Sequence, residues 1–202
     1  MVRISLAVLT LAAAVHATPT SVRPLLVGEA IPSAKVQTLD GKTTDLAKEL
    51  KGGHTILVFY RGSWCPYCNR QLAALGGIKG KLKELGWKMA AISPDRPELL
   101  RETKGKHKID YELYSDSPCN AARAMGLAFT VEEKKLKKLK KHGIDLLWAS
   151  GQTHRQLPVP AVYLVGPDGK VLFQYANPNY RVRLDGNILL AAAEAYGPNL
   201  SR

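Results

Sequence analysis

Residues 55–75, "TILVFYRGSWCPYCNRQLAAL", contain the strongest fold signal in the sequence. The first six of these residues form an uninterrupted apolar, partly β-branched run, which is typical of a strand buried on both faces. Gly62 then breaks the strand, and leucines follow at helical spacing, at positions 72, 75, 82 and 85, with Gly76-Gly77 as a candidate interruption. Cys65 and Cys68 therefore lie where a buried strand is expected to give way to a helix.

Strand-like and helix-like segments alternate along the rest of the chain. Strands are predicted near residues 35–45 (a hairpin around Asp-Gly), 87–93, 111–116, 160–165 and 170–176, and helices at 97 onward, 119–129, within 130–142 and at 184–197. Asp95 is expected to be the N-cap of the helix after Pro97, with Glu98 closing a capping box. This alternation, ending in a hairpin, indicates an α/β domain with a mixed central sheet flanked by helices.

A thiol at the start of a helix is favoured as a thiolate. We expect Cys65 in the first turn, where free backbone N–H groups and the positive end of the helix dipole stabilise negative charge. Lowering a thiol pKa from about 8.5 to about 7 raises the ionised fraction more than tenfold at neutral pH. Cys68 lies one turn later, near enough for a disulfide, and Pro66 suits an early helical position because it needs no hydrogen-bond donor. Trp64 is expected to shield one side of the sulfur.

Three other uses of the cysteine pair are alternatives to redox chemistry. A zinc site needs about four ligands, and no second C-x-x-C or H-x₃-H stands at a matching distance. A purely structural disulfide closing so short a loop would constrain the unfolded chain little. Two inert core cysteines are the third alternative. The strand-to-helix setting favours a redox pair, with no metal.

The amino terminus resembles a processing signal. Arg3 is the only charge before "ISLAVLTLAAAV", and Val15 to Ala17 offer small residues at the cleavage positions. We expect a signal peptide over residues 1–17, a linker over 18–24 and one domain over 25–202; a buried or disordered segment is the alternative to the signal. The expected location is the periplasm, the medium or the lumen of the secretory pathway, where disulfides persist.

The net charge of +12 is concentrated in "EEKKLKKLKKHG", residues 132–143. We expect an inserted Lys-rich helix at about 130–142, on which Leu136 and Leu139 form a narrow apolar stripe. A solvated face is the simplest interpretation of the lysines between Lys134 and Lys141, and an acidic partner is an alternative. No nucleic acid is expected, because the segment has neither arginine nor aromatic residues.

The chain resembles the peroxiredoxin-like redoxins of the alkyl hydroperoxide reductase/thiol-specific antioxidant group. "FYRGSWCPYCNRQL" (residues 59–72) and "LPVPAVYLVGPDGKVLFQYANPNYRVRL" (residues 157–184) carry the resemblance, which extends from about residue 25 to the carboxyl terminus. It implies a thioredoxin-like fold, with Cys65 and Cys68 catalytic and Trp64, Pro66, Tyr67 and Pro160 supporting them. It also implies a cis Val159-Pro160 bond opposite the cysteines; the alternative is a trans proline that starts a strand.

Two departures from the family pattern bear on activity. Typical peroxiredoxins have a threonine three residues before the peroxidatic cysteine, where this chain has Gly62, and an arginine near the start of the later strand, where it has Pro160. These side chains hold and polarise the peroxide, so their absence argues against a fast, specialised peroxidase. Arg61 and Arg155 are candidate substitutes. Cys-Pro-Tyr-Cys, which resembles the glutaredoxin dithiol, favours thiol–disulfide exchange.

Both expected mechanisms use Cys65 as the nucleophile and Cys68 as the resolving thiol. Attack on a protein disulfide or on a hydroperoxide ends with the same Cys65–Cys68 disulfide, reset by a thiol donor such as a thioredoxin-like protein or glutathione, with no cofactor. A dedicated thioredoxin- or glutathione-dependent peroxidase is the alternative enzyme. A binding module anchored by the Lys-rich helix is the non-enzymatic one.

A third cysteine, Cys119, follows Pro118 at another expected helix start. It is a candidate third redox thiol because a helix start could activate it. The interpretation that we prefer is a small residue buried in the helix's first turn.

Overall fold

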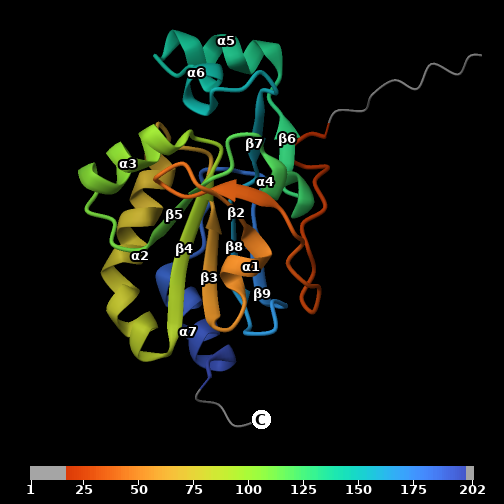
Figure 1. The fold of residues 1–202 in the computed structure, drawn as a ribbon. Coiled ribbons are helices and arrows are strands. Elements are labelled where there is room, and N and C mark those ends of the chain that lie inside the picture. The colour runs from red at the N-terminus through yellow and green to blue at the C-terminus, as the bar shows by residue number, and fades with distance from the viewer. Residues whose placement is uncertain (1–16, 199–202) are drawn as a thin grey trace, which may run out of the picture.

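The computed structural model describes residues 17–198 and contains a seven-stranded mixed sheet in the order β2-β1-β5-β4-β3-β8-β9 (Figure 1). At its centre, β3 (His54–Phe59) pairs in parallel with β4 (Trp87–Ser93), which pairs in parallel with β5 (Glu112–Ser115). On the other side of β3, β8 (Ala161–Val165) and β9 (Val171–Ala176) form the predicted antiparallel hairpin. The hairpin β1 (Lys35–Gln37) and β2 (Thr43–Asp45) completes the other edge. The predicted α/β fold is confirmed.

Helices cover both faces of this sheet. α2 (Pro66–Glu84), α3 (Pro97–Lys106) and α7 (Gly186–Tyr196) pack on one face, whereas α1 (Leu46–Leu50) and α4 (Asn120–Ala124) pack on the other. Successive side chains of β3 point to opposite faces: Ile56 and Val58 join the α2 side, and Leu57 and Phe59 the α1 side. An uninterrupted apolar run in β3 is therefore what burial on two faces requires.

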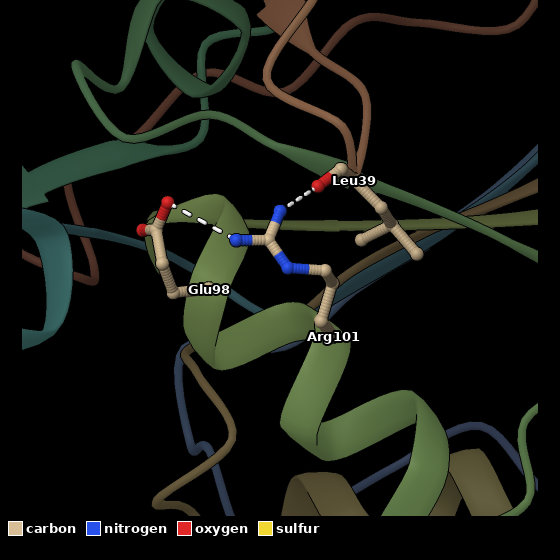
Figure 2. A network of polar contacts seen from close by, with 3 residues as sticks. All are labelled: Leu39, Glu98 and Arg101. Carbon is tan, nitrogen blue, oxygen red and sulfur yellow. Dashed lines mark hydrogen bonds and ion pairs between the residues drawn. The ribbon is translucent and has the colours of Figure 1, made fainter.

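A polar contact fastens α3 to the β1–β2 hairpin (Figure 2). The Arg101 guanidinium donates a hydrogen bond through Nη1 to the carbonyl oxygen of Leu39 in the hairpin turn, and its Nη2 lies 3.3 Å from Oε1 of Glu98 one turn earlier on α3. The side of the sheet opposite β8 and β9 is thus tied to the helix that follows β4.

An insertion stands beyond the sheet, at the top of Figure 1. It contains the short ladder of β6 (Ala128–Thr130) with β7 (Gln156–Pro158), the Lys-rich helix α5 (Glu133–Lys141) and α6 (Leu146–Ser150). The insertion has a small apolar cluster of its own, formed by the buried residues Val131, Leu139, Leu146 and Leu157. The partly buried residues that pack against this cluster are Trp64, Phe129, Leu136 and Ile144. The predicted leucine stripe on the basic helix therefore faces inward.

The predicted linker over residues 18–24 lies in a segment that contacts the residues between α4 and β6, and β6 itself. The backbone N–H of Arg23 donates to the carbonyl of Gly126 (3.1 Å), and that of Thr130 donates to the carbonyl of Ala17 (3.1 Å). Residues 1–16 of the expected signal peptide lie outside the described residues. No helix in the described part is both long and apolar enough to cross a membrane.

Three local predictions about helices are wrong. The helix predicted over 119–129 ends at Ala124, because Gly126 adopts a left-handed φ of 67°. The Arg23 carbonyl approaches Gly126 so closely that any side chain at this position would collide with it. α2 runs unbroken through Gly76-Gly77. Arg96, without a side-chain cap bond, is the N-cap of α3, since the Asp95 carboxylate binds elsewhere.

Candidate active site

Cys65 is the N-cap residue of α2, one position before the first turn in which it was expected, and Pro66 occupies the first helical position. β3, at the centre of the sheet, leads into the loop that carries Cys65, and α2 packs against one face of the sheet. Both cysteine side chains join the apolar cluster under α2, where Cys65 is 1% exposed and Cys68 fully buried. No disulfide joins them, so the structure is that of the dithiol.

The Cys65 thiol is more acidic than an ordinary cysteine thiol. A hydrogen bond from the Cys68 thiol, opposed by burial and aided by the charges of Arg61 and Arg183, lowers the pKa of Cys65 from 9.0 to about 6. A thiol with that pKa is roughly nine-tenths ionised at pH 7. Burial and the hydrogen bond given to Cys65 raise the pKa of Cys68 well above its ordinary value. At neutral pH the pair therefore consists of a thiolate at Cys65 and a thiol at Cys68.

An arginine from the far end of the sequence touches the second cysteine. Arg183 lies 3.3 Å from the Cys68 sulfur through Nη2 and donates to Oε1 of Gln71 through Nη1 at 3.0 Å. Its Nε donates to the Tyr180 carbonyl at 2.9 Å. One side chain thus joins the segment before α7 to the first turns of α2 and holds a positive charge against the resolving thiol.

The loop that carries Cys65 is held by a buried carboxylate. Asp95, two residues after the end of β4, accepts a hydrogen bond from the Ser63 backbone N–H at 2.6 Å, and the Asn69 amide donates to the Ser63 carbonyl at 2.8 Å. Gly62 has a φ of +147°, and a Cβ there would lie 2.3 Å from the Trp64 ring and 2.8 Å from Asp95. This backbone excludes a threonine at residue 62, so the departure from the peroxiredoxin pattern is part of the loop's geometry.

Arg61 lies between two aromatic rings beside the sulfur. Its guanidinium is 4.1 Å from the Tyr180 ring centre and 5.0 Å from the Trp64 ring centre, and Nη1 is 4.0 Å from the Cys65 sulfur. Trp64 packs against both the α2 cluster and the cluster of the insertion, which connects the active-site loop to the Lys-rich helix. Tyr67 meets Tyr180 edge to face at 5.7 Å.

The prediction of a cis proline is wrong. The Val159-Pro160 bond is trans, like every other described peptide bond. Pro160 connects β7 to β8 and so takes the alternative role of a proline at the start of a strand, where its missing N–H costs no ladder bond. It shares a pocket wall with Arg61 and thus still lies near the active-site loop.

Cys119 is placed as a buried residue. It is the N-cap of α4 in a left-handed conformation, its side chain is fully buried, and its sulfur lies 3.6 Å from the Gln156 carbonyl. Burial and the charge of Asp116 raise the pKa of Cys119 far above that of a free thiol. Its environment thus fits the packed residue better than an activated third redox thiol.

Sequence reasoning pointed to Arg61 and missed Arg183 and Asp95 as site residues. Arg155, the other candidate beside the sulfur, instead pairs with Glu133 at 2.7 Å and is about half exposed. Arg183 lies in the carboxyl-terminal stretch that carries the family resemblance, where no local pattern marks it as a site residue. Within residues 17–198, no group of three or more His, Cys, Asp or Glu side chains is arranged to hold a metal ion.

A mixed sheet with a thiolate and a thiol at the start of the helix that follows its central strand defines a thioredoxin-fold thiol oxidoreductase. A family model described as the AhpC/TSA family matches residues 27–174, and the chain belongs to this family. The family assignment makes it an enzyme of the thiol–disulfide oxidoreductase and peroxiredoxin class, not a bare binding module.

Relatives of both kinds resemble the chain. It is 26% identical over 161 residues to the thiol-disulfide oxidoreductase ResA of Bacillus thuringiensis, covering 79% of this chain and 75% of ResA. It is 29% identical over 104 residues to the putative peroxiredoxin bcp of Haemophilus influenzae, covering 52% of this chain and 66% of that protein. Reduced Prx3 of Vibrio vulnificus, crystallised with hydrogen peroxide, superposes with a TM-score of 0.69 at 14% identity over 84% of this chain and 99% of Prx3.

Proposed function

We propose that the protein cycles between a Cys65/Cys68 dithiol and disulfide, with protein-disulfide exchange as its preferred reaction and hydroperoxide reduction as the second. The observation that carries the proposal is the arrangement of the pair: both thiols lie at the start of α2, with Arg61 beside the Cys65 sulfur and Arg183 beside the Cys68 sulfur. In keeping with it, the pKa of Cys65 is lowered by a hydrogen bond from Cys68 and that of Cys68 is raised by burial, so that Cys65 is the nucleophile and Cys68 keeps its proton. A nucleophile and a resolving thiol are therefore already in contact in the reduced state.

In disulfide exchange, the Cys65 thiolate attacks one sulfur of a substrate disulfide and releases the other as a thiolate. Cys68 then loses its proton and attacks the Cys65 sulfur of the mixed disulfide. The second substrate sulfur leaves as a thiolate, so one substrate disulfide is reduced by two electrons and one internal disulfide forms. Arg183 supports this step because its guanidinium, 3.3 Å away, stabilises the negative charge that develops on Cys68.

In hydroperoxide reduction, the Cys65 thiolate attacks the terminal peroxide oxygen, the O–O bond breaks and an alcohol or water leaves after taking a proton. Condensation of the sulfenic acid with Cys68 then releases water and gives the same disulfide. Arg61 favours this second activity, because it is the cation placed to polarise an oxygen near Cys65. Disulfide exchange is preferred because the backbone at Gly62 has no room for the side chain that peroxiredoxins use at this position.

The experiment compares two activities of purified protein with dithiothreitol as donor: insulin disulfide reduction and hydrogen peroxide consumption. Cys65→Ser is expected to abolish both, and Cys68→Ser to leave one alkylation-sensitive thiol and no turnover on insulin. Cys119→Ser, off the site, serves as the control and is expected to retain both activities. Insulin reduction that survives Cys65→Ser would refute the mechanism, and peroxide consumption alone, without insulin reduction, would reverse the order of the two activities.

We further propose that the chain works after export, in an oxidising compartment, with a thiol donor that resets the disulfide. The support is the amino-terminal sequence pattern and the dependence of either reaction on an external reductant. We also propose that an acidic partner binds the basic surface of α5 between Lys134 and Lys141. The support is the positive charge of this helix.

A further inference from the structure

A pocket of about 250 Å³ opens beside the active-site loop. It is lined by residues from the amino-terminal segment, the β6 strand, the start of α5 and the segment before α7. Its apolar walls come from Pro19, Phe129, Val131, Pro160 and Pro178. Its charged groups are Arg61, Lys135 and Glu132, and the Tyr180 ring forms part of the wall. The pocket adjoins the reactive sulfur through Arg61, whose Nη1 is 4.0 Å from Cys65.

The guanidinium of Arg61 lacks the partner that a buried cation ordinarily has. Arg61 is only 5% exposed, its Nε has no hydrogen-bond partner, and no ion pair in the described structure joins it to a carboxylate. Burying a charge is costly unless it is paired and hydrogen-bonded. The Cys65 sulfur is a distant acceptor, 4.0 Å from Nη1 of Arg61. The Tyr180 and Trp64 rings contact the guanidinium through cation–π interactions, which do not replace a hydrogen-bond acceptor. Arg61 therefore brings an incompletely paired positive charge to the pocket that it lines.

A second cation stands at the same pocket. Lys135, in the first turn of α5, lies with its Nζ 5.7 Å from the Tyr180 ring centre and forms no ion pair with another described residue. Lys135 and Arg61 both face the Tyr180 ring, so this wall is electropositive; a hydrogen bond with Arg181, together with these charges, lowers the pKa of Tyr180. Two cations and one carboxylate, that of Glu132, complement a ligand with two carboxylates and one ammonium group.

We infer that this pocket binds a small carboxylate-bearing peptide thiol in its mixed disulfide with Cys65. The inference rests on the proposed function and specifies its small-molecule partner. Arg61 is placed to bind the carboxylate nearer the sulfur and Lys135 one farther out, while the apolar walls cover the peptide backbone and its methylene groups. A guanidinium that can form charge-assisted bonds to a carboxylate gives the site its selectivity.

The step balances with two molecules of thiol. The first thiolate attacks Cys65 of the Cys65–Cys68 disulfide, forms the mixed disulfide and releases Cys68 as a thiolate that takes up a proton. A second thiolate attacks the peptide sulfur, releases the Cys65 thiolate and leaves the peptide thiol as its disulfide. The protein gains two electrons, and two thiols are oxidised to one disulfide.

The test measures the rate at which thiols reduce the isolated Cys65–Cys68 disulfide form of the full chain. The probes are glutathione, its diethyl ester and 2-mercaptoethanol, with rates expressed per thiolate. Glutathione is expected to react faster than its diester, and Lys135→Gln to slow glutathione about three- to tenfold while leaving 2-mercaptoethanol unchanged. Lys138→Gln, an exposed lysine one turn along α5 and outside the pocket, is the matched control and is expected to leave all three rates unchanged.

Equal rates for glutathione and its diester, or equal effects of Lys135→Gln and Lys138→Gln, would overturn the inference. Those outcomes leave insulin reduction with dithiothreitol, and its loss in Cys65→Ser, intact. Failure of the proposed function would instead be seen as dithiothreitol-driven activity that persists without Cys65. The two failures are therefore distinguishable.

Discussion

At the scale of single residues, the site depends on which charges reach each sulfur. Cys65 receives a hydrogen bond from Cys68 and lies near Arg61, while Cys68 has Arg183 at 3.3 Å. Arg183 thus has two effects: it favours the Cys65 thiolate, and it lowers the cost of ionising Cys68 when the mixed disulfide must be resolved. We regard it as a catalytic residue, because its guanidinium contacts the Cys68 sulfur, and it also holds Gln71 and the Tyr180 carbonyl.

Arg183→Gln is predicted to raise the pKa of Cys65 by about half a unit to one unit, because a nearby positive charge is lost. Alkylation of Cys65 by iodoacetamide, followed between pH 5 and 9, measures the shift. Arg181→Gln, two residues away, removes a charge that faces Tyr180, and it should leave the profile in place. Arg183→Lys keeps the positive charge, so the pKa of Cys65 should rise less than in Arg183→Gln. A purely structural role of Arg183 would not predict this difference. An unchanged profile in Arg183→Gln would contradict this assignment.

At the scale of elements, the active-site loop is fixed from two sides. Asp95 and Asn69 hold its backbone, and Trp64 connects it to the cluster beneath α5 and α6. The Lys-rich helix is consequently not an isolated charged appendage. Its leucine stripe packs against residues that also support the loop, so a change in the insertion can reach the environment of Cys65.

Leu139→Ala is predicted to loosen α5 and α6 while the central sheet stays folded, because Leu139 is one of only four buried residues in that described cluster. Truncation of a buried leucine costs about 2 to 5 kcal/mol, which is large for so small a cluster. Amide hydrogen exchange should become faster in residues 133–150 and remain slow in β3 and β4. Lys137→Ala, on the exposed face, is the control. Equal loss of protection in β3 would show that the insertion and sheet unfold together.

Local sequence signals predicted the elements that long-range contacts did not override. β4 matches its predicted range, residues 87–93, because its apolar run is long and bounded by turn signals. Asp95 has the sequence of an N-cap, yet its carboxylate binds the Ser63 N–H 32 residues away, a pairing that no local pattern reveals. Arg183 reaches Cys68 across 115 residues for the same reason. α6 and β7 were missed because five and three residues are too few to show a period.

In the molecule as a whole, two kinds of buried ionisable group make the free energy of unfolding depend on pH, and they act in opposite directions. Burial raises the pKa of Asp95 and that of Asp116 from 3.8 to about 6, so the folded state binds more protons than the unfolded state between those values. Their contribution to the free energy of unfolding is greatest below pH 4 and is lost as the pH rises through 6. Cys65 acts in the opposite sense, because its folded pKa of about 6 lies below its ordinary 9.0.

The dithiol form should therefore gain stability relative to the disulfide form between pH 6 and 9. The Cys65 contribution is absent below pH 6, grows as the pH rises and is complete above 9, where it is worth about 2 to 4 kcal/mol. The disulfide form has no ionisable Cys65 and lacks this gain, whereas both forms share the loss caused by Asp95 and Asp116. Urea unfolding of the two forms at pH 5, 6, 7.5 and 8.5 measures the difference directly. A gap between their unfolding free energies that stays constant from pH 6 to 8.5 would mean that Cys65 is not an acidic thiol, and the redox cycle would then lack its nucleophile at neutral pH.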